Sequence, residues 1–227
     1  MKNSIKIGFG ASIVAALALL MFSACFFIIL TTQKFSTWTD IQDYIDLAVK
    51  NNQTSKYIAQ FCALVFGISY QIILYCIVDN VSPEKKIFAK ISTSFSTVFL
   101  TLIGINYFLQ LTYVRFGIES SNTSGLEQWI MFNPNSVSLS IAMLGWTVLF
   151  GLSSLFASRA IEGMRLAKTI RILFLLNGFF CLLGGFGFVF QFVMLVNFTM
   201  NIGMGGTMTA LTICLSIYFG RKLQIKD

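Results

Sequence analysis

Six long apolar segments follow one another along this chain of 227 residues, separated by shorter stretches that carry most of the charge. A helix needs about 20 mostly apolar residues to cross the hydrocarbon core of a bilayer. The segments that meet this requirement lie at about 7–30, 57–78, 88–113, 137–157, 172–196 and 198–219. The pattern predicts an all-α, polytopic membrane helix bundle with six transmembrane helices, forming a single transmembrane domain over residues 1–227.

Lys and Arg are divided unequally between the two sets of loops. The N-terminus, the 79–90 and 158–171 loops and the C-terminal tail hold 12 of the 16. The other four are Lys34, Lys50, Lys56 and Arg115. Because short loops rich in Lys and Arg stay in the cytoplasm, we expect a multi-pass plasma-membrane protein with cytoplasmic N- and C-termini.

The amino-acid composition also indicates a membrane protein. Hydrophobic residues make up 56% of the chain and charged residues 11%, against about half and about a quarter in soluble domains. The net charge of +7 would suit a nucleic-acid partner, but the cations sit in short clusters beside apolar segments. Membrane orientation explains those clusters, so we expect the lipid bilayer and not nucleic acid as the partner.

The two longer outer loops each carry a pattern typical of a short interfacial helix. In the first, Thr39 and Gln42 have capping-box spacing, and Tyr44 and Ile45 lie on an apolar face. In the second, Ser124 and Glu127 repeat that spacing, followed by an apolar edge that includes Trp129. We therefore predict two short outer interfacial helices, each acting either as a functional lid or simply as a closure of the bundle.

Two further boundaries follow from local residue types. Asn133 suits a helix N-cap and Pro134 the first helical position of the fourth span. Almost no polar sequence separates the last two spans, so we expect the segment from Asn197 to Asn201 to form the tight hairpin between them.

The spans hold few groups that could carry out chemistry. The chain has no His, no carboxylate within an apolar segment, and five Cys in apolar segments without Cys-x-x-Cys spacing. Intramembrane proton relays and metal sites use such groups. We therefore expect no enzyme, no metal, no cofactor and no proton coupling.

Neutral polar side chains remain, and they are richest in the third span. At 100° per residue, a stripe of this span joins Ser92 and Ser96 to amide and hydroxyl side chains nearer its outer end. Together with polar residues of the fifth span, these give a predicted ligand-binding set of Asn106, Gln110, Tyr113, Asn177 and Gln191. The same residues could serve only as hydrogen-bonding contacts between helices. Gln191 is the expected partner of Asn106 and Gln110 across the bundle.

The first span has small residues four apart, which permit close approach of another helix. Its Ala11-x-x-x-Ala15 pair resembles the small-residue motif of the substrate-binding subunits of energy-coupling-factor transporters, which are six-helix vitamin binders. The acidic helix predicted after the first span departs from that family, which puts the correspondence in doubt.

A broader resemblance covers most of the chain. Residues 105–112 (INYFLQLT), 132–136 (FNPNS), 144–146 (LGW) and 171–178 (RILFLLNG) resemble a group of small bacterial six-helix integral membrane proteins. No activity is attached to that group, so the resemblance implies fold and membrane setting only.

Two functional hypotheses follow. The first is a protein that binds or passes a neutral or weakly polar small molecule through an outward-facing polar cluster. The alternative is a non-catalytic accessory subunit that packs against a membrane-protein partner or forms a homo-oligomer, as the small-residue face of the first span suggests.

Overall fold

The computed structural model describes residues 2–32, 40–50, 53–120, 122–163 and 165–224, and these residues form helices, turns and no strand. Among these described residues, six helical stretches are long and apolar enough to cross a membrane, which confirms the predicted fold class. In chain order the spans are α1 (Lys2–Thr32), α3 (Thr54–Val78), α4 (Lys86–Leu109), α6 with α7 (Val137–Met143 and Phe150–Ala160), α8 (Arg165–Val189), and α9 with α10 (Val193–Asn197 and Gly205–Gln224).

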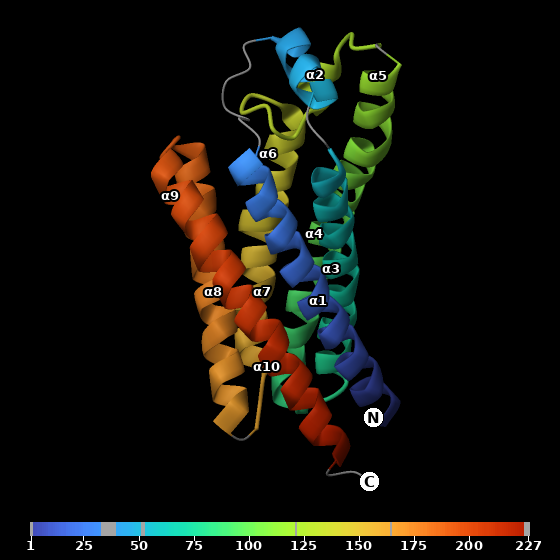
Figure 1. Cartoon of the computed structure of the whole chain (residues 1–227). Helices are drawn as coiled ribbons and strands as arrows, with labels where there is room; N and C mark the ends of the chain where they lie inside the picture. Colours follow the sequence, from blue (N-terminus) through green and yellow to red (C-terminus); the bar gives the residue numbers. More distant parts are fainter. Residues whose placement is uncertain (1, 33–39, 51–52, 121, 164, 225–227) are drawn as a thin grey trace.

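The spans stand side by side in one elongated bundle (Figure 1). Each described span packs against the next one along the chain, and α10 returns to pack against α1, so the contacts close into a ring. The α1–α10 contact is close because glycines lie in it. A Cβ on Gly8 would lie 2.9 Å from the Phe219 ring, and Gly220 lies against Phe9. The small-residue face of the first span therefore packs inside the bundle.

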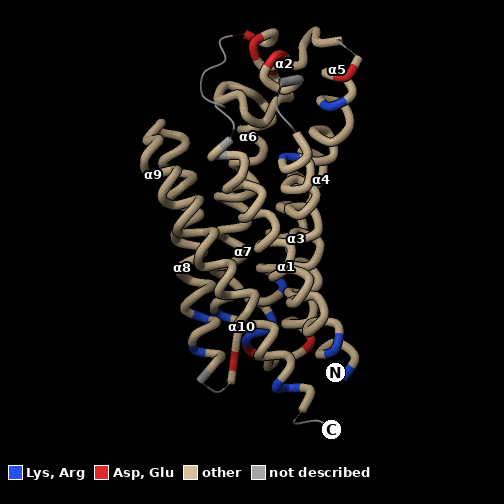
Figure 2. The backbone as a smooth tube through the Cα atoms, viewed as in Figure 1, with Lys and Arg blue, Asp and Glu red and all other residues tan. Residues whose placement is uncertain are grey.

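Both termini lie at one end of the bundle, here called the terminal end, where the described Lys and Arg residues are concentrated (Figure 2). The opposite end, the cap end, is covered by α2 (Ile41–Lys50), α5 (Arg115–Glu119) and the 3-10 segment η3 (Leu126–Trp129). These three elements form the cap. Tyr44 and Ala48 of α2 pack there on Val114, Leu126 and Ile130.

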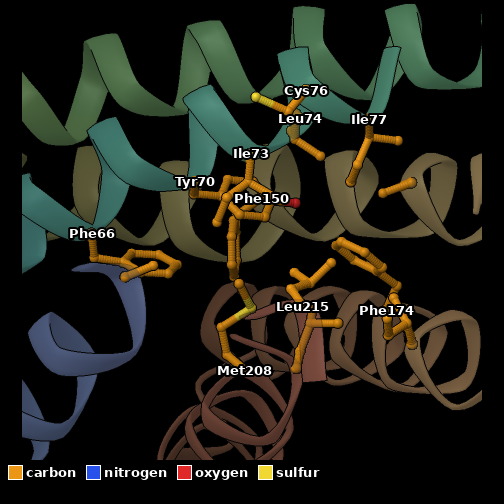
Figure 3. Packing of buried hydrophobic residues seen from close by; sticks show 14 of the residues in the cluster. Phe66, Tyr70, Ile73, Leu74, Cys76, Ile77, Phe150, Phe174, Met208 and Leu215 are labelled. Atoms are coloured by element: carbon orange, nitrogen blue, oxygen red, sulfur yellow. The ribbon is translucent and has the colours of Figure 1, made fainter. Parts of the chain in front are cut away.

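Aromatic side chains fill the centre of the ring. Phe150 lies with its ring centroid 4.9 Å from Tyr70 and 4.8 Å from Phe99, and Trp146 lies 4.9 Å from Phe99. Phe66 completes the cluster, which continues toward the terminal end through Ile73, Ile77 and Phe174 (Figure 3). The ring interior is thus a packed core at this depth.

Within the described residues, three π-helical segments interrupt the spans: η2 (Gln110–Val114), η4 (Leu144–Leu149) and η5 (Phe198–Met204). A π turn takes in an extra residue, and such turns are frequent at functional sites. Side chains beyond each segment therefore lie on faces that a uniform α-helix would not predict.

Of the predicted helix starts, one involves a residue outside the described part of the chain and another differs from the structure. Thr39 lies outside the described residues, and the Asp40 carboxylate accepts a hydrogen bond from the Asp43 N–H at 2.9 Å at the start of α2. The fourth span begins at Val137 and is capped by Ser136, whose hydroxyl accepts from Leu139 N–H at 3.0 Å. Asn133 instead accepts from the Asn135 N–H at 3.1 Å, within a turn that precedes the helix.

The remaining differences concern an outer loop and the last hairpin. The second predicted interfacial helix is only the short η3, because Gly125 enters it at a positive φ of 73° without a side-chain cap. The hairpin between the last two spans lies at Phe190–Phe192 rather than at Asn197–Asn201, which is helical. Gln191 makes the reversal by adopting φ 60°, a conformation that no Gly or Pro in the sequence marked.

Candidate ligand-binding site at the cap end

Asn106 and Gln110 are both buried, and other parts of the chain satisfy their amides. Asn106 accepts a hydrogen bond from the Ser138 hydroxyl and donates to the Ser138 carbonyl at 3.2 Å. Gln110 donates to the Trp129 carbonyl and to the Ser138 hydroxyl, and accepts from the Met131 N–H at 3.2 Å. These two residues therefore fasten the third span to α6 and to the cap.

The other three predicted site residues lie apart from this pair. Asn177 is buried on α8, where it donates to Ser154 at 2.8 Å and accepts from Thr207 at 3.2 Å. Tyr113 is 46% exposed, with its ring 6.3 Å from that of Trp129. Gln191 is exposed in the α8–α9 turn, so the structure does not bring it to Asn106 or Gln110.

A hydrogen-bonded chain of hydroxyls crosses the middle of the ring. The Tyr70 hydroxyl lies 3.1 Å from that of Ser153 and 3.4 Å from that of Ser154. Ser153 continues the chain to Ser92 of α4, and Ser154 continues it to Asn177. With Thr207 of α10 included, five spans are joined through α7. All these groups therefore have hydrogen-bond partners within the bundle.

Lys56 is also buried at the cap end, but its polar group is only partly satisfied, unlike the amides of Asn106 and Gln110. Its side chain is 3% exposed, although it carries an ammonium group. The ammonium donates one hydrogen bond, to the Tyr44 hydroxyl, and lies 5.1 Å and 5.5 Å from the ring centroids of Tyr44 and Phe132. No carboxylate of the described chain pairs with it. An ammonium has three donors, so two of them have no acceptor among the described residues.

Gln60 lies one turn deeper on α3 and is 2% exposed. Neither its amide nitrogen nor its amide oxygen has a hydrogen-bond partner, and it is the one described side chain for which this holds at both atoms. Leaving such a group buried and unpaired costs about 1–3 kcal/mol. Native proteins seldom keep such groups without an ordered water, an ion or a function to account for them.

The direction of Gln60 follows from its neighbours on the same helix face. Gly67 and Gln71 are seven and eleven residues on, within about 20° of Gln60 at 100° per residue. Both face α4, since Gln71 donates to Thr97 at 2.8 Å and a Cβ on Gly67 would meet Ile103. Arg115 lies 5.5 Å from the ring of Tyr57, one turn before Gln60. Gln60 therefore lies toward the α4–η2 stretch between Ile103 and Arg115.

Lys56 and Gln60, here called the outer polar pair, could not be singled out from the sequence for identifiable reasons. Lys56 counted as a loop cation because it precedes the apolar run, and the structure places it inside α3 beneath the cap. Gln60 is one polar residue in an apolar helix, with nothing to separate it from Gln71. Their spacing of four residues was the one available signal, because it places both on one face of a helix.

The groups at this site are hydrogen-bond donors, an acceptor and a positive charge. The pair offers N–H donors and one carbonyl acceptor, with a positive charge at its cap side. No group of three His, Cys, Asp or Glu that could hold a metal occurs in the described part of the chain. Comparison with protein-family models, curated proteins and solved structures found no match to this chain. The basis for a function is therefore the geometry of the outer polar pair.

Proposed function

We propose that this protein is a non-catalytic membrane protein that binds a small molecule at its cap end, with the outer polar pair as the binding groups. The observation that carries the proposal is Gln60, whose amide is buried with neither polar atom partnered by a described residue. Lys56 is buried one turn away and has donors that no described residue accepts, so it adds a second group of the same kind. A bound molecule would supply hydrogen-bond partners to both residues.

The charge of Lys56 narrows the chemistry of that molecule. A buried ammonium without a counter-charge is costly, and a bound anion offsets that cost. A carboxylate or carbonyl oxygen next to Lys56, with further polar atoms toward Gln60, matches the unused donors. The proposed ligand is therefore a small organic acid or a carbonyl compound of otherwise neutral character.

The packed centre of the ring favours a protein that binds a small molecule over one that passes it across the membrane. Phe66, Phe99, Trp146 and Phe150 occupy the path from the outer polar pair toward the terminal end. The alternative of an accessory subunit rested in part on the small residues of the first span, and these residues face α3 and α10.

We further propose that the protein resides in the plasma membrane with both termini in the cytoplasm. The concentration of Lys and Arg at the terminal end supports this orientation (Figure 2). The cap end, and with it the ligand site, then faces outward.

Native mass spectrometry of protein purified in mild detergent tests the binding proposal. We expect the wild type to carry a small molecule, or to bind benzoate or acetate in preference to benzamide or acetamide, which have the same shape without the charge. Gln60→Leu should lose the bound mass, and Lys56→Met should lose the preference for the acid over the amide. Asn106→Leu is the matched control, because its partners lie within the chain. The proposal fails if the wild type and Gln60→Leu give the same spectra and the same ligand responses.

A further inference from the structure

A second candidate site lies at the terminal end, between α7 and α8. A pocket of about 720 Å³ opens there, within the range of ligand sites. Its walls come from the end of α7, the following turn with Gly163, and the first turns of α8, with Lys85 of the α3–α4 connection at its edge. It is far from the outer polar pair and does not depend on the function proposed for that pair.

The polar side of this pocket carries an excess of positive charge. Arg159, Lys168 and Arg171 line it, and none of them makes an ion pair or hydrogen bond to a described residue. Glu162 is the one acid among the described lining residues, and it already has partners. It accepts from the Ser82 hydroxyl at 2.6 Å and lies 3.9 Å from the Lys85 ammonium. The three remaining cations are available to an anion.

The other side of the pocket is apolar and faces away from the bundle. Ile172, Leu175 and Leu176 line it, and they are 49%, 47% and 37% exposed. They continue the α8 face that carries Lys168 and Arg171, because residues three, four and seven apart lie on one side of a helix. Along α8 the pocket wall thus changes from cationic to apolar with increasing depth in the bundle.

We propose that this pocket binds the headgroup of an anionic phospholipid, with its phosphate held by Arg159, Lys168 and Arg171. The acyl chains would then run along Ile172, Leu175 and Leu176. A free phosphate would use the cations and leave the apolar wall unused, whereas a phospholipid matches both. Basic pockets between spans on the cytoplasmic side of a membrane bind such headgroups.

The test is a titration of the full-length protein in detergent, with lipid-bound masses read by native mass spectrometry. The probes are phosphatidylglycerol, phosphatidylcholine with the same acyl chains, and inorganic phosphate. We expect phosphatidylglycerol to bind more tightly than phosphatidylcholine. Each of Arg159→Gln and Arg171→Gln should weaken phosphatidylglycerol about fivefold, the equivalent of one cation near a membrane surface. Leu175→Gln should weaken phosphatidylglycerol and leave binding of inorganic phosphate unchanged.

A double variant, Lys90→Gln with Arg221→Gln, is the matched control. Both residues are exposed on the terminal half and neither lines the pocket, so two charges are removed without touching the site. Equal binding of the two lipids would overturn the proposal, as would equal weakening by the control. If inorganic phosphate competes completely and Leu175→Gln has no effect, the pocket binds free phosphate and the phospholipid proposal is wrong. Melting curves check that every variant is folded.

Discussion

The hydroxyl groups of Tyr70 and Ser153 lie 3.1 Å apart at the centre of the ring, although 83 residues separate them in the sequence. The contact joins the second span to the fourth, and so crosses the ring instead of following its circumference. Ser153 also exchanges hydrogen bonds with Ser92 of the third span, which makes α7 the helix on which the polar contacts converge.

Tyr70→Phe tests how much this hydrogen bond across the ring contributes to the stability of the protein. The variant keeps the ring packed against Phe66 and Phe150 and removes the hydroxyl. Because Ser153 and Ser154 keep partners in Ser92 and Asn177, we expect a loss of about 0.5–1.5 kcal/mol in unfolding free energy. Tyr75→Phe, at a 57% exposed position, is the control and should melt like the wild type. Equal melting of both variants would show that the hydroxyl contributes nothing.

Gln110→Leu should destabilise the protein more than Asn106→Leu does. Gln110 bonds to Trp129 of the cap and to Met131 just after it as well as to Ser138, and the variant leaves those backbone groups unpaired. Asn106 bonds to Ser138 alone. We expect a loss of about 1–3 kcal/mol for Gln110→Leu, measured by melting in detergent. If neither variant changes the melting curve, the hydrogen bonds to the cap are energetically irrelevant.

Gln60→Leu should stabilise the protein, whereas Gln110→Leu should destabilise it. In the ligand-free protein the substitution removes two buried, unpaired polar atoms, so we expect the melting temperature to rise. Any rise that a bound ligand gives to the wild type should be absent from the variant. This combination of greater stability with lost binding is typical of a functional site. A fall in the melting temperature of the ligand-free variant would mean that Gln60 has a stabilising partner.

A glycine substitution on α8 tests how closely α7 and α8 pack, and a second one on α4 is its control. A Cβ on Gly178 would lie 2.6 Å from Leu155 and 2.8 Å from the carbonyl oxygen of Gly151. Gly178→Ala should therefore cost about 1–3 kcal/mol through overpacking. A Cβ on Gly104 would meet no described atom within 4 Å, so Gly104→Ala should gain about 0.5–1 kcal/mol through helix propensity. Thermal melts of the two variants in one detergent should move in opposite directions.

Cysteine labelling on a cysteine-free background tests the proposed orientation. Asn122 and Glu84 are exposed near opposite ends of the bundle. In intact cells, Asn122→Cys should react with a membrane-impermeant maleimide, and Glu84→Cys should react only after the membrane is opened. The reverse labelling pattern would show that the protein has the opposite orientation, with the outer polar pair on the cytoplasmic side.

The sequence alone determined the number of spans and the end of the bundle on which the charges gather. The number of spans follows from the transfer free energy summed over about 20 residues, and the charged end follows from the number of Lys and Arg in each loop. Neither quantity depends on what a segment packs against. The spans at 57–78 and 137–157 were accordingly close to α3 and to the stretch from Val137 to Ala160.

Only the tertiary structure decided which polar side chains meet, because each contact depends on the direction of a single side chain and on several neighbouring segments. Gln110 and Tyr113 shared a stripe at 100° per residue, but the π-helical turn that begins at Gln110 separates them. Gln110 is 1% exposed and Tyr113 is 46% exposed. Lys56 and Gln60 needed the cap and α4 in place before one could be seen as buried without a counter-charge and the other without a partner. Hydrophobicity is additive along a chain, whereas hydrogen-bond satisfaction is a property of the packed whole.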